Sequence, residues 1–117
     1  IFLNDGSGSF EMKALPTEAQ SSPVYAIAAK DLNGDGLPEL VIGGNLSRAK
    51  PETGIYMGSY GWVLHNVGGG DFKALWPHES GLLVNGEIRS LLWAGPTLLI
   101  GKNNGPVEAF KLSKPEF

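Results

Sequence analysis

Two stretches of this chain repeat each other at a spacing of 62 residues. Residues 1–10 read IFLNDGSGSF and residues 63–72 read VLHNVGGGDF, so one Asn, two Gly and one Phe recur at matching positions. A Lys-Ala-Leu segment follows each copy, at 13–15 and at 73–75. A second match interleaves with the first: 24–29 (VYAIAA) and 39–45 (ELVIGGN) resemble 88–93 (IRSLLW) and 97–103 (TLLIGKN). Self-similarity of this kind indicates a repeat architecture.

The order of the repeated hairpins predicts the fold. With the two hairpins named AB and CD, the chain runs CD, AB, CD, AB, C. Four strands in a period of about 60 residues are typical of a β-propeller blade with a long insertion. We therefore expect an all-β chain of antiparallel blades in the order CD-ABCD-ABC, with fewer than two blades in all. Because a propeller needs at least about four blades to close, either the chain belongs to a longer propeller or several copies assemble.

Composition supports strands over helices. The chain has 17 Gly and 8 Pro among 117 residues, and both residue types penalise helix interiors. A hydrophobic content of 42% excludes disorder. Apolar runs between Gly, Asn, Asp and Pro clusters predict nine strands, at 1–3, 10–15, 24–30, 39–43, 61–66, 72–76, 87–93, 97–101 and 107–112. Only 16–22 is expected to hold a helical turn. We expect a partial blade at 1–16, a complete blade at 24–77 and a partial blade at 86–113, with a surface insert at 45–60 that carries a short strand at 55–57.

Charge and cysteine content exclude several classes of function. A net charge of −3 offers no basic field to phosphates, so we expect no nucleic-acid partner. The absence of cysteine excludes disulfides, thiolate metal sites and cysteine nucleophiles. No apolar run approaches the length of about 18 residues that a membrane span requires. The chain begins with Ile1 and shows no charged-then-apolar leader, so we expect a segment of a longer protein or a processed product.

The segment 31–39, DLNGDGLPE, is the motif with a defined chemistry. Oxygen-bearing side chains stand at its positions 1, 3, 5 and 9, and a Gly at position 6 permits a sharp turn. Ca²⁺ takes about six to eight oxygen ligands, which a curled acidic loop can supply. The expected ligands are the carboxylates of Asp31, Asp35 and Glu39, the amide oxygen of Asn33 and the backbone carbonyl of Leu37.

Two other interpretations of this loop are possible. An EF-hand also begins this way, but it requires Glu at position 12 and flanking helices, and Ile42 stands there inside an apolar run. An ordinary Asn-Gly or Asp-Gly hairpin turn with solvated acids is the alternative to a metal site. Three acids in nine residues would repel one another without a cation, which favours the metal site. Mg²⁺ is the weaker candidate because it tends to keep several waters.

The segment 24–45, VYAIAAKDLNGDGLPELVIGGN, resembles the FG-GAP repeat of integrin α-subunit propellers and of bacterial proteins with VCBS-type repeats. The bacterial integrin-like group, which includes ASPIC/UnbV-type proteins, is the most similar. The resemblance implies four-stranded blades around a channel, with Ca²⁺ in the loop between the first two strands. The chain departs from the family at Glu39, where Asp is usual, and in its long insert before Gly61. The second hairpin has no acidic loop, so it should bind no metal.

Several other residues could be mistaken for functional ones. His65 and His78 have no paired acid at short spacing, which favours surface or packing roles. Gly68–Gly70 reads as a turn, because no helix follows it as a phosphate cradle requires. Trp62, Trp76 and Trp93 could stack on a sugar, although packing between blades is the better interpretation. Asn45-Leu-Ser47 fits a glycosylation acceptor, which would have no meaning in a bacterial protein.

Two classes of function follow. The first is a calcium-stabilised binding or adhesion scaffold, not an enzyme, whose loops present a surface to a protein or glycan. The second is a noncatalytic propeller part of a larger secreted carbohydrate-active enzyme. A calcium site of this kind predicts a location outside the cytoplasm, in the periplasm, on the surface or secreted. Unpaired blade edges and the open apolar faces of Phe10, Leu15, Leu91 and Trp93 predict a homo-oligomer of the isolated segment.

Overall fold

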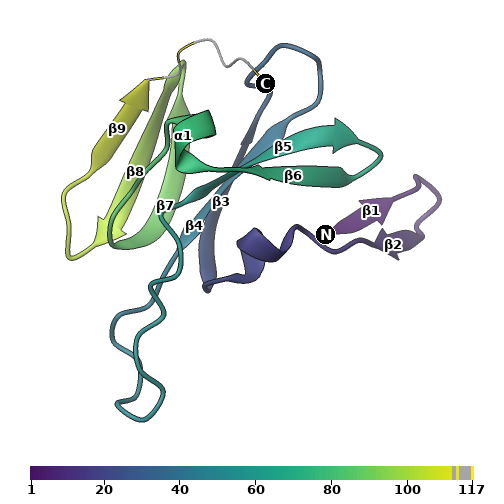
Figure 1. Ribbon diagram of the computed structural model, residues 1–117. Helices are drawn as coiled ribbons and strands as arrows, with labels where there is room; N and C mark the ends of the chain where they lie inside the picture. The colour runs from purple at the N-terminus through teal and green to yellow at the C-terminus, as the bar shows by residue number, and fades with distance from the viewer. Residues whose placement is uncertain (112, 114–116) are drawn as a thin grey trace.

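The described residues form three antiparallel β-sheets of two, four and three strands (Figure 1). The structure is a computed structural model and describes residues 1–111, 113 and 117. Its strands are β1 (Phe2–Asn4), β2 (Phe10–Met12), β3 (Val24–Lys30), β4 (Glu39–Gly44), β5 (Trp62–Gly68), β6 (Asp71–Leu75), β7 (Glu87–Ala94), β8 (Thr97–Asn103) and β9 (Glu108–Lys111). A 3₁₀ turn, η1 (Thr17–Gln20), and a short helix, α1 (Pro77–Ser80), complete the described elements. The sheets are β1-β2, β3-β4-β5-β6 and β7-β8-β9.

The all-β, antiparallel prediction is confirmed, with differences at element ends. β2 stops at Met12 rather than at 15, and the strand expected at 55–57 is only an isolated bridge between Leu46 and Tyr56. The last residue of the strand expected at 107–112 lies outside the described residues. The expectation that only 16–22 holds a helical turn was wrong, because α1 forms at Pro77–Ser80. The carboxylate of Glu79 accepts the Trp76 N–H at 2.7 Å and caps this helix, which Gly81 ends in the left-handed conformation.

The sequence repeat is also a repeat of strand register. Leu40 pairs with Leu64 across β4 and β5, and Leu98 pairs with Phe110 across β8 and β9. Leu40 and Leu98 occupy the same position in the repeated segments 39–45 and 97–103. The side-chain oxygens of Asn4 and Asn66 likewise accept the N–H two residues later, at 2.8 and 3.0 Å. The equivalent strands therefore pair in the same way.

The irregularities of strand pairing also recur at equivalent positions of the repeat. The register of the β3–β4 pair shifts between Val24 and Ala26, and that of the β7–β8 pair shifts between Ile88 and Ser90. The residues passed over by these two shifts are Tyr25 and Arg89. The Arg89 guanidinium lies 4.1 Å from the centre of the Tyr25 ring, a cation–π distance. The two bulges thus join the four-stranded sheet to the three-stranded sheet.

The two central strands of the four-stranded sheet, β4 and β5, are buried on both faces. One face packs with β7 and β8 in a core that holds Val41, Val63, Ile88 and Ile100, and Leu82 and Val84 from the connection after α1 also lie in it. The other face packs against the N-terminal segment in a second core: Ala19, Ile42, Trp62, Leu64 and Ala74. Neighbouring residues of a strand enter opposite cores because side chains alternate between the faces of a sheet.

Part of the expected apolar exposure is not found. Phe10 is 62% exposed, as expected. Leu15 packs against the second core, however, and Leu91 and Trp93 pack against the first. The expectation that these three lie open was wrong, because packing within one chain already buries them in part.

Gly43 and Gly44 allow the close approach that this packing needs. A Cβ on Gly43 would stand 2.6 Å from Ile88 Cδ1, and a Cβ on Gly44 would stand 1.6 Å from the backbone oxygen of Pro23. The clash at Gly44 is with the main chain, which cannot rotate out of the way. β4 therefore ends in two residues that have no side chain.

We expect Gly44→Ala to lower the free energy of unfolding by about 3 kcal/mol or more, because the added methyl must displace backbone. Gly105→Ala is the matched control. Its Cβ would meet only the flexible side chain of Lys102, at 3.1 Å or more, so a change within about 0.5 kcal/mol is expected. Urea unfolding of both variants measures the difference. Equal stabilities would contradict the packing described here.

Candidate functional site

The loop 31–39 joins β3 to β4 and keeps the curled form that its sequence suggests. Gly34 and Gly36 adopt φ values of 85° and 87°, which side-chain-bearing residues rarely adopt. Asp31 Oδ1 accepts the Gly34 N–H at 2.7 Å and Asp31 Oδ2 accepts the Gly36 N–H at 3.0 Å. The first carboxylate of the motif therefore lies inside the turn of the loop.

Asn33 and Asp35 continue this pattern. Asn33 Oδ1 accepts the Asp35 N–H at 3.0 Å, and Asp35 Oδ1 accepts the Leu37 N–H at 2.8 Å. The Asn33 amide donates to Asp35 Oδ2 at 3.0 Å, which joins the two side chains. The Leu37 N–H, the Asn33 amide and the charge of His65 hold the pKa of Asp35 below its usual 3.8.

The donor set of Asp31, Asn33 and Asp35 fits a hard divalent cation. A carboxylate has about four lone-pair sites, so each oxygen that accepts one N–H keeps a lone pair for a second partner. Two carboxylates and one amide oxygen are the ligand types that Ca²⁺ prefers. The other coordination positions would be filled by backbone oxygen, such as the carbonyl of Leu37, and by water.

Glu39 is not gathered with these residues. Its side chain is fully buried, its Oε2 accepts the Leu32 N–H at 2.8 Å, and its Oε1 lies 3.0 Å from His65 Nδ1. In the described part of the chain, no three His, Cys, Asp or Glu side chains form a group that could hold a metal ion. Glu39 instead fixes the start of the loop to β4.

His65 is the residue that sequence reasoning missed at this site. It lies on β5, 26 residues after Glu39, so no short-range spacing relates the two. The pairing of β4 with β5 brings them together, as Leu40 opposite Leu64 requires. One signal was present in the sequence: Glu39 precedes Leu40, and His65 follows Leu64, the residue that pairs with Leu40.

A second candidate region is the insert 45–60, which projects from the body of the molecule between β4 and β5 (Figure 1). Asn45 fixes its base. This side chain is 1% exposed, and its amide donates to the backbone oxygens of Ser59 and Gly86 at 2.6 and 3.0 Å. Its Oδ1 accepts the Ser22 hydroxyl and the Ser59 N–H. A side chain enclosed in this way is not a glycosylation acceptor in the folded chain.

Glu87 holds the insert from the neighbouring sheet. The carboxylate is 4% exposed and accepts four donors: the Ser47 N–H and hydroxyl, the Asn103 amide and the Arg89 guanidinium. These hydrogen bonds, with the Ser47 hydroxyl contributing most, lower the pKa of Glu87 from 4.5 to about 2. Sequence spacing could not find this site, since Ser47 and Glu87 lie 40 residues apart.

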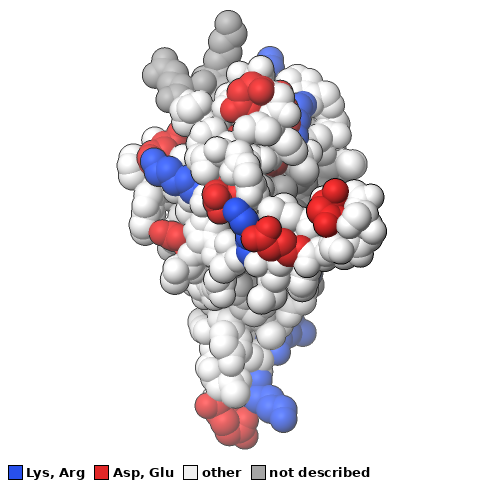
Figure 2. All heavy atoms as spheres, turned by 90° about the vertical axis from the view of Figure 1, so that its right-hand side faces the viewer, with Lys and Arg blue, Asp and Glu red and all other residues white. Residues whose placement is uncertain are grey.

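The returning arm of the insert, from Ile55 to Tyr60, presents apolar and aromatic side chains to solvent. Ile55 is 68% exposed, and Tyr56, Met57 and Tyr60 are also exposed. Figure 2 shows acidic and basic side chains together at the lower end of the molecule, where Figure 1 places the insert. A firmly anchored base, a returning arm with exposed apolar side chains and a charged tip suit the insert to contact with another molecule.

The three Trp side chains do not form a sugar platform. Trp62 lies in the second core, and the 52% exposed Trp76 meets it edge-on, with ring centres 5.3 Å apart. Trp93 packs against the first core under the Lys30 ammonium, 4.9 Å from its ring centre. The positions of Trp62 and Trp93 thus agree with the packing role that the sequence favours over sugar binding.

Comparison with known proteins adds no relative: no family model, no curated protein and no solved structure matches this chain. Among the described residues, no helix is both long and apolar enough to cross a membrane.

The Glu87 site predicts a specific acid sensitivity. Because the folded-state pKa, about 2, lies below the ordinary 4.5, ionised Glu87 stabilises the fold above pH 4.5. That stabilisation is lost as the pH falls from about 4.5 to about 2, where the unfolded chain binds the proton first. Across this range, the melting temperature should therefore fall more steeply with decreasing pH for the native chain than for Glu87→Gln.

Asp5 and Asp35 also have lowered pKa values, but both are present in either protein. The difference between the two pH profiles therefore isolates Glu87. Parallel profiles would contradict the assignment of Glu87 as an ionised, hydrogen-bonded group.

Proposed function

We propose that this chain is a calcium-stabilised segment of an FG-GAP-type β-propeller that serves as a scaffold for binding a protein or a glycan. The observation that carries the proposal is the loop 31–39, in which Asp31, Asn33 and Asp35 turn their oxygens into one curled turn. The three sheets are the blades: a two-stranded part, a complete four-stranded blade and a three-stranded part. The repeated registers and the burial of β4 and β5 on both faces support this.

The ligand set makes the calcium site a weak one. Affinity for Ca²⁺ rises with the number of charged ligands, and extracellular modules bind with Kd values of about 10⁻⁴–10⁻³ M. With Glu39 engaged by Leu32 and His65, only two carboxylates face the loop. Such a site is filled where calcium is millimolar, so we place the protein outside the cytoplasm.

Calcium should raise the thermal stability of the chain. At a concentration a hundredfold above Kd, a single site adds about 2.7 kcal/mol to the free energy of unfolding. Melts in excess calcium and in chelator measure this directly. In Asp35→Ala, the difference between the melting temperatures in calcium and in chelator should shrink, because one of the two carboxylates is gone.

Asp71→Ala is the matched control, since this exposed acid begins β6, lies outside the loop and has its ion pair with Lys13. It should keep the full response to calcium. If the native chain melts identically with calcium and with chelator, the loop is only a turn and the calcium site is refuted.

The insert is the proposed contact surface of the scaffold. Replacing Ile55 and Tyr56 together by Ser removes exposed apolar area, and neither side chain belongs to the two cores. We expect the melting temperature to stay unchanged while binding to protein or glycan arrays is lost. Leu83→Ser, at another exposed apolar position, is the control. Array binding by the double variant equal to that of the native chain would exclude the insert.

The alternative is a noncatalytic propeller part of a larger secreted carbohydrate-active enzyme. The chain itself fits both functions, because propellers host many activities. The parent gene distinguishes them. An attached catalytic domain would favour the enzyme part, and a gene without any export signal would contradict the proposed location.

A further inference from the structure

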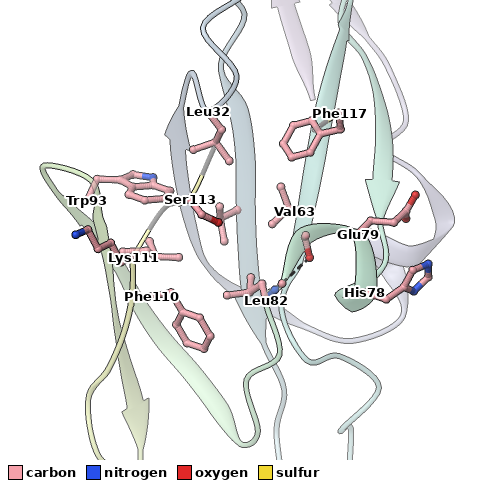
Figure 3. A pocket seen from close by; sticks show the side chains of 14 residues that line it. Leu32, Val63, His78, Glu79, Leu82, Trp93, Phe110, Lys111, Ser113 and Phe117 are labelled. Carbon is pink, nitrogen blue, oxygen red and sulfur yellow. Dashed lines mark hydrogen bonds between the residues drawn. The ribbon is translucent and has the colours of Figure 1, made fainter. Parts of the chain in front are cut away.

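A cavity of about 400 Å³ opens between the four-stranded and the three-stranded sheets. Figure 3 shows Trp93 and Phe110 approaching it from the three-stranded sheet and Val63 from the four-stranded sheet. Leu82 and neighbouring residues of the connection after β6 close another side. The lining is mixed: apolar side chains from the two sheets face polar residues of α1 and of the chain end, and the chain's own Ser113 and Phe117 also line it. Phe110, another lining residue, belongs to β9.

The interface on the other face of the four-stranded sheet indicates what this cavity lacks. There the fourth strand, β6, supplies Ala74 and Phe72 to the second core. Ala74 stands opposite Leu64, and Leu64 is the repeat equivalent of Phe110. Within the described residues, β9 pairs with β8 alone. Phe110 therefore has no described cross-strand neighbour where Leu64 has one.

We propose that the β9 edge and this cavity are the docking site for strand β2 of a second copy of the chain. β2 is the repeat counterpart of β6, since Phe10 matches Phe72 at the spacing of 62 residues, which places Met12 at the position of Ala74. β2 also pairs with only one strand, β1, among the described residues. Added antiparallel strands of this kind bind through main-chain hydrogen bonds. The proposal does not rest on the calcium site.

Charge and apolar complementarity select the register. When Lys111 stands opposite Glu11 in an antiparallel pair, Phe110 stands opposite Met12. Met12 is 74% exposed, so docking would bury an apolar side chain that the single chain leaves in water. Neither Glu11 nor Lys111 takes part in an ion pair within the described structure, and opposite charges on facing strands attract.

The two surfaces lie at opposite ends of the molecule, with β9 on the left and the β1–β2 hairpin on the right in Figure 1. The contact is therefore head-to-tail, and such contacts produce rings or open chains of copies. A net charge of −3 per chain opposes this association only weakly.

Light scattering coupled to size exclusion tests the proposal on the whole chain. The native chain should show a mass above 12.4 kDa that rises with concentration. Met12→Lys should weaken association by about tenfold or more, since burying a Met side chain is worth at least that factor. Ile55→Lys, at a comparably exposed apolar position on the insert, should leave association unchanged.

A charge exchange tests the register. Glu11→Lys and Lys111→Glu should each weaken association by roughly fivefold, and both side chains are exposed enough to leave the fold intact. An equimolar mixture of the two variants should recover association, because each β9 edge then meets a β2 of opposite charge. A monomer at every concentration, equal effects of Met12→Lys and Ile55→Lys, or no recovery in the mixture would overturn the proposal.

Discussion

Burial of β4 and β5 on both faces is the constraint on which the rest of the structure depends. Val41 and Val63 enter one core and Ile42 and Leu64 enter the other. The N-terminal hairpin has no buried residue of its own, and small sheets need a partner to be stable. The flanking sheets are therefore held in place by the middle one, and the separation of the two cores by a single sheet fixes their mutual orientation.

Strand β4 also positions both candidate regions, through a buried polar residue at each end. Glu39 opens the strand and Asn45 follows its last residue, and both are at most 1% exposed. A buried carboxylate or amide is costly unless it is hydrogen-bonded, so each side chain must keep its partners. Glu39 keeps the start of the acidic loop, and Asn45 keeps the base of the insert. The two loops consequently share one rigid support.

The sequence repeat predicted the strands and their grouping because packing imposes periodic side chains and turns on every copy. The oxygen-rich residues of the acidic loop were also predictable, since they lie within nine residues. What sequence could not reveal were the partners of buried polar groups: His65 for Glu39, and Ser47 for Glu87. These pairs form only when distant strands or different sheets meet. Helix α1 was missed for another reason. Its N-cap is Trp76, an unusual residue at that position, and the cap is made by Glu79, which accepts the Trp76 N–H.

The two copies of the repeat differ where packing does not constrain them. The AB hairpin of the three-stranded sheet closes through a two-residue turn between Ala94 and Thr97, whereas that of the four-stranded sheet carries the acidic loop. The buried Glu39 has Thr97 as its repeat equivalent, and His65 has Lys111. The acid and the histidine are thus present only in the copy that has the loop. A polar side-chain contact that packing alone required would recur with the packing, so its restriction to one copy indicates that Glu39 and His65 serve the loop.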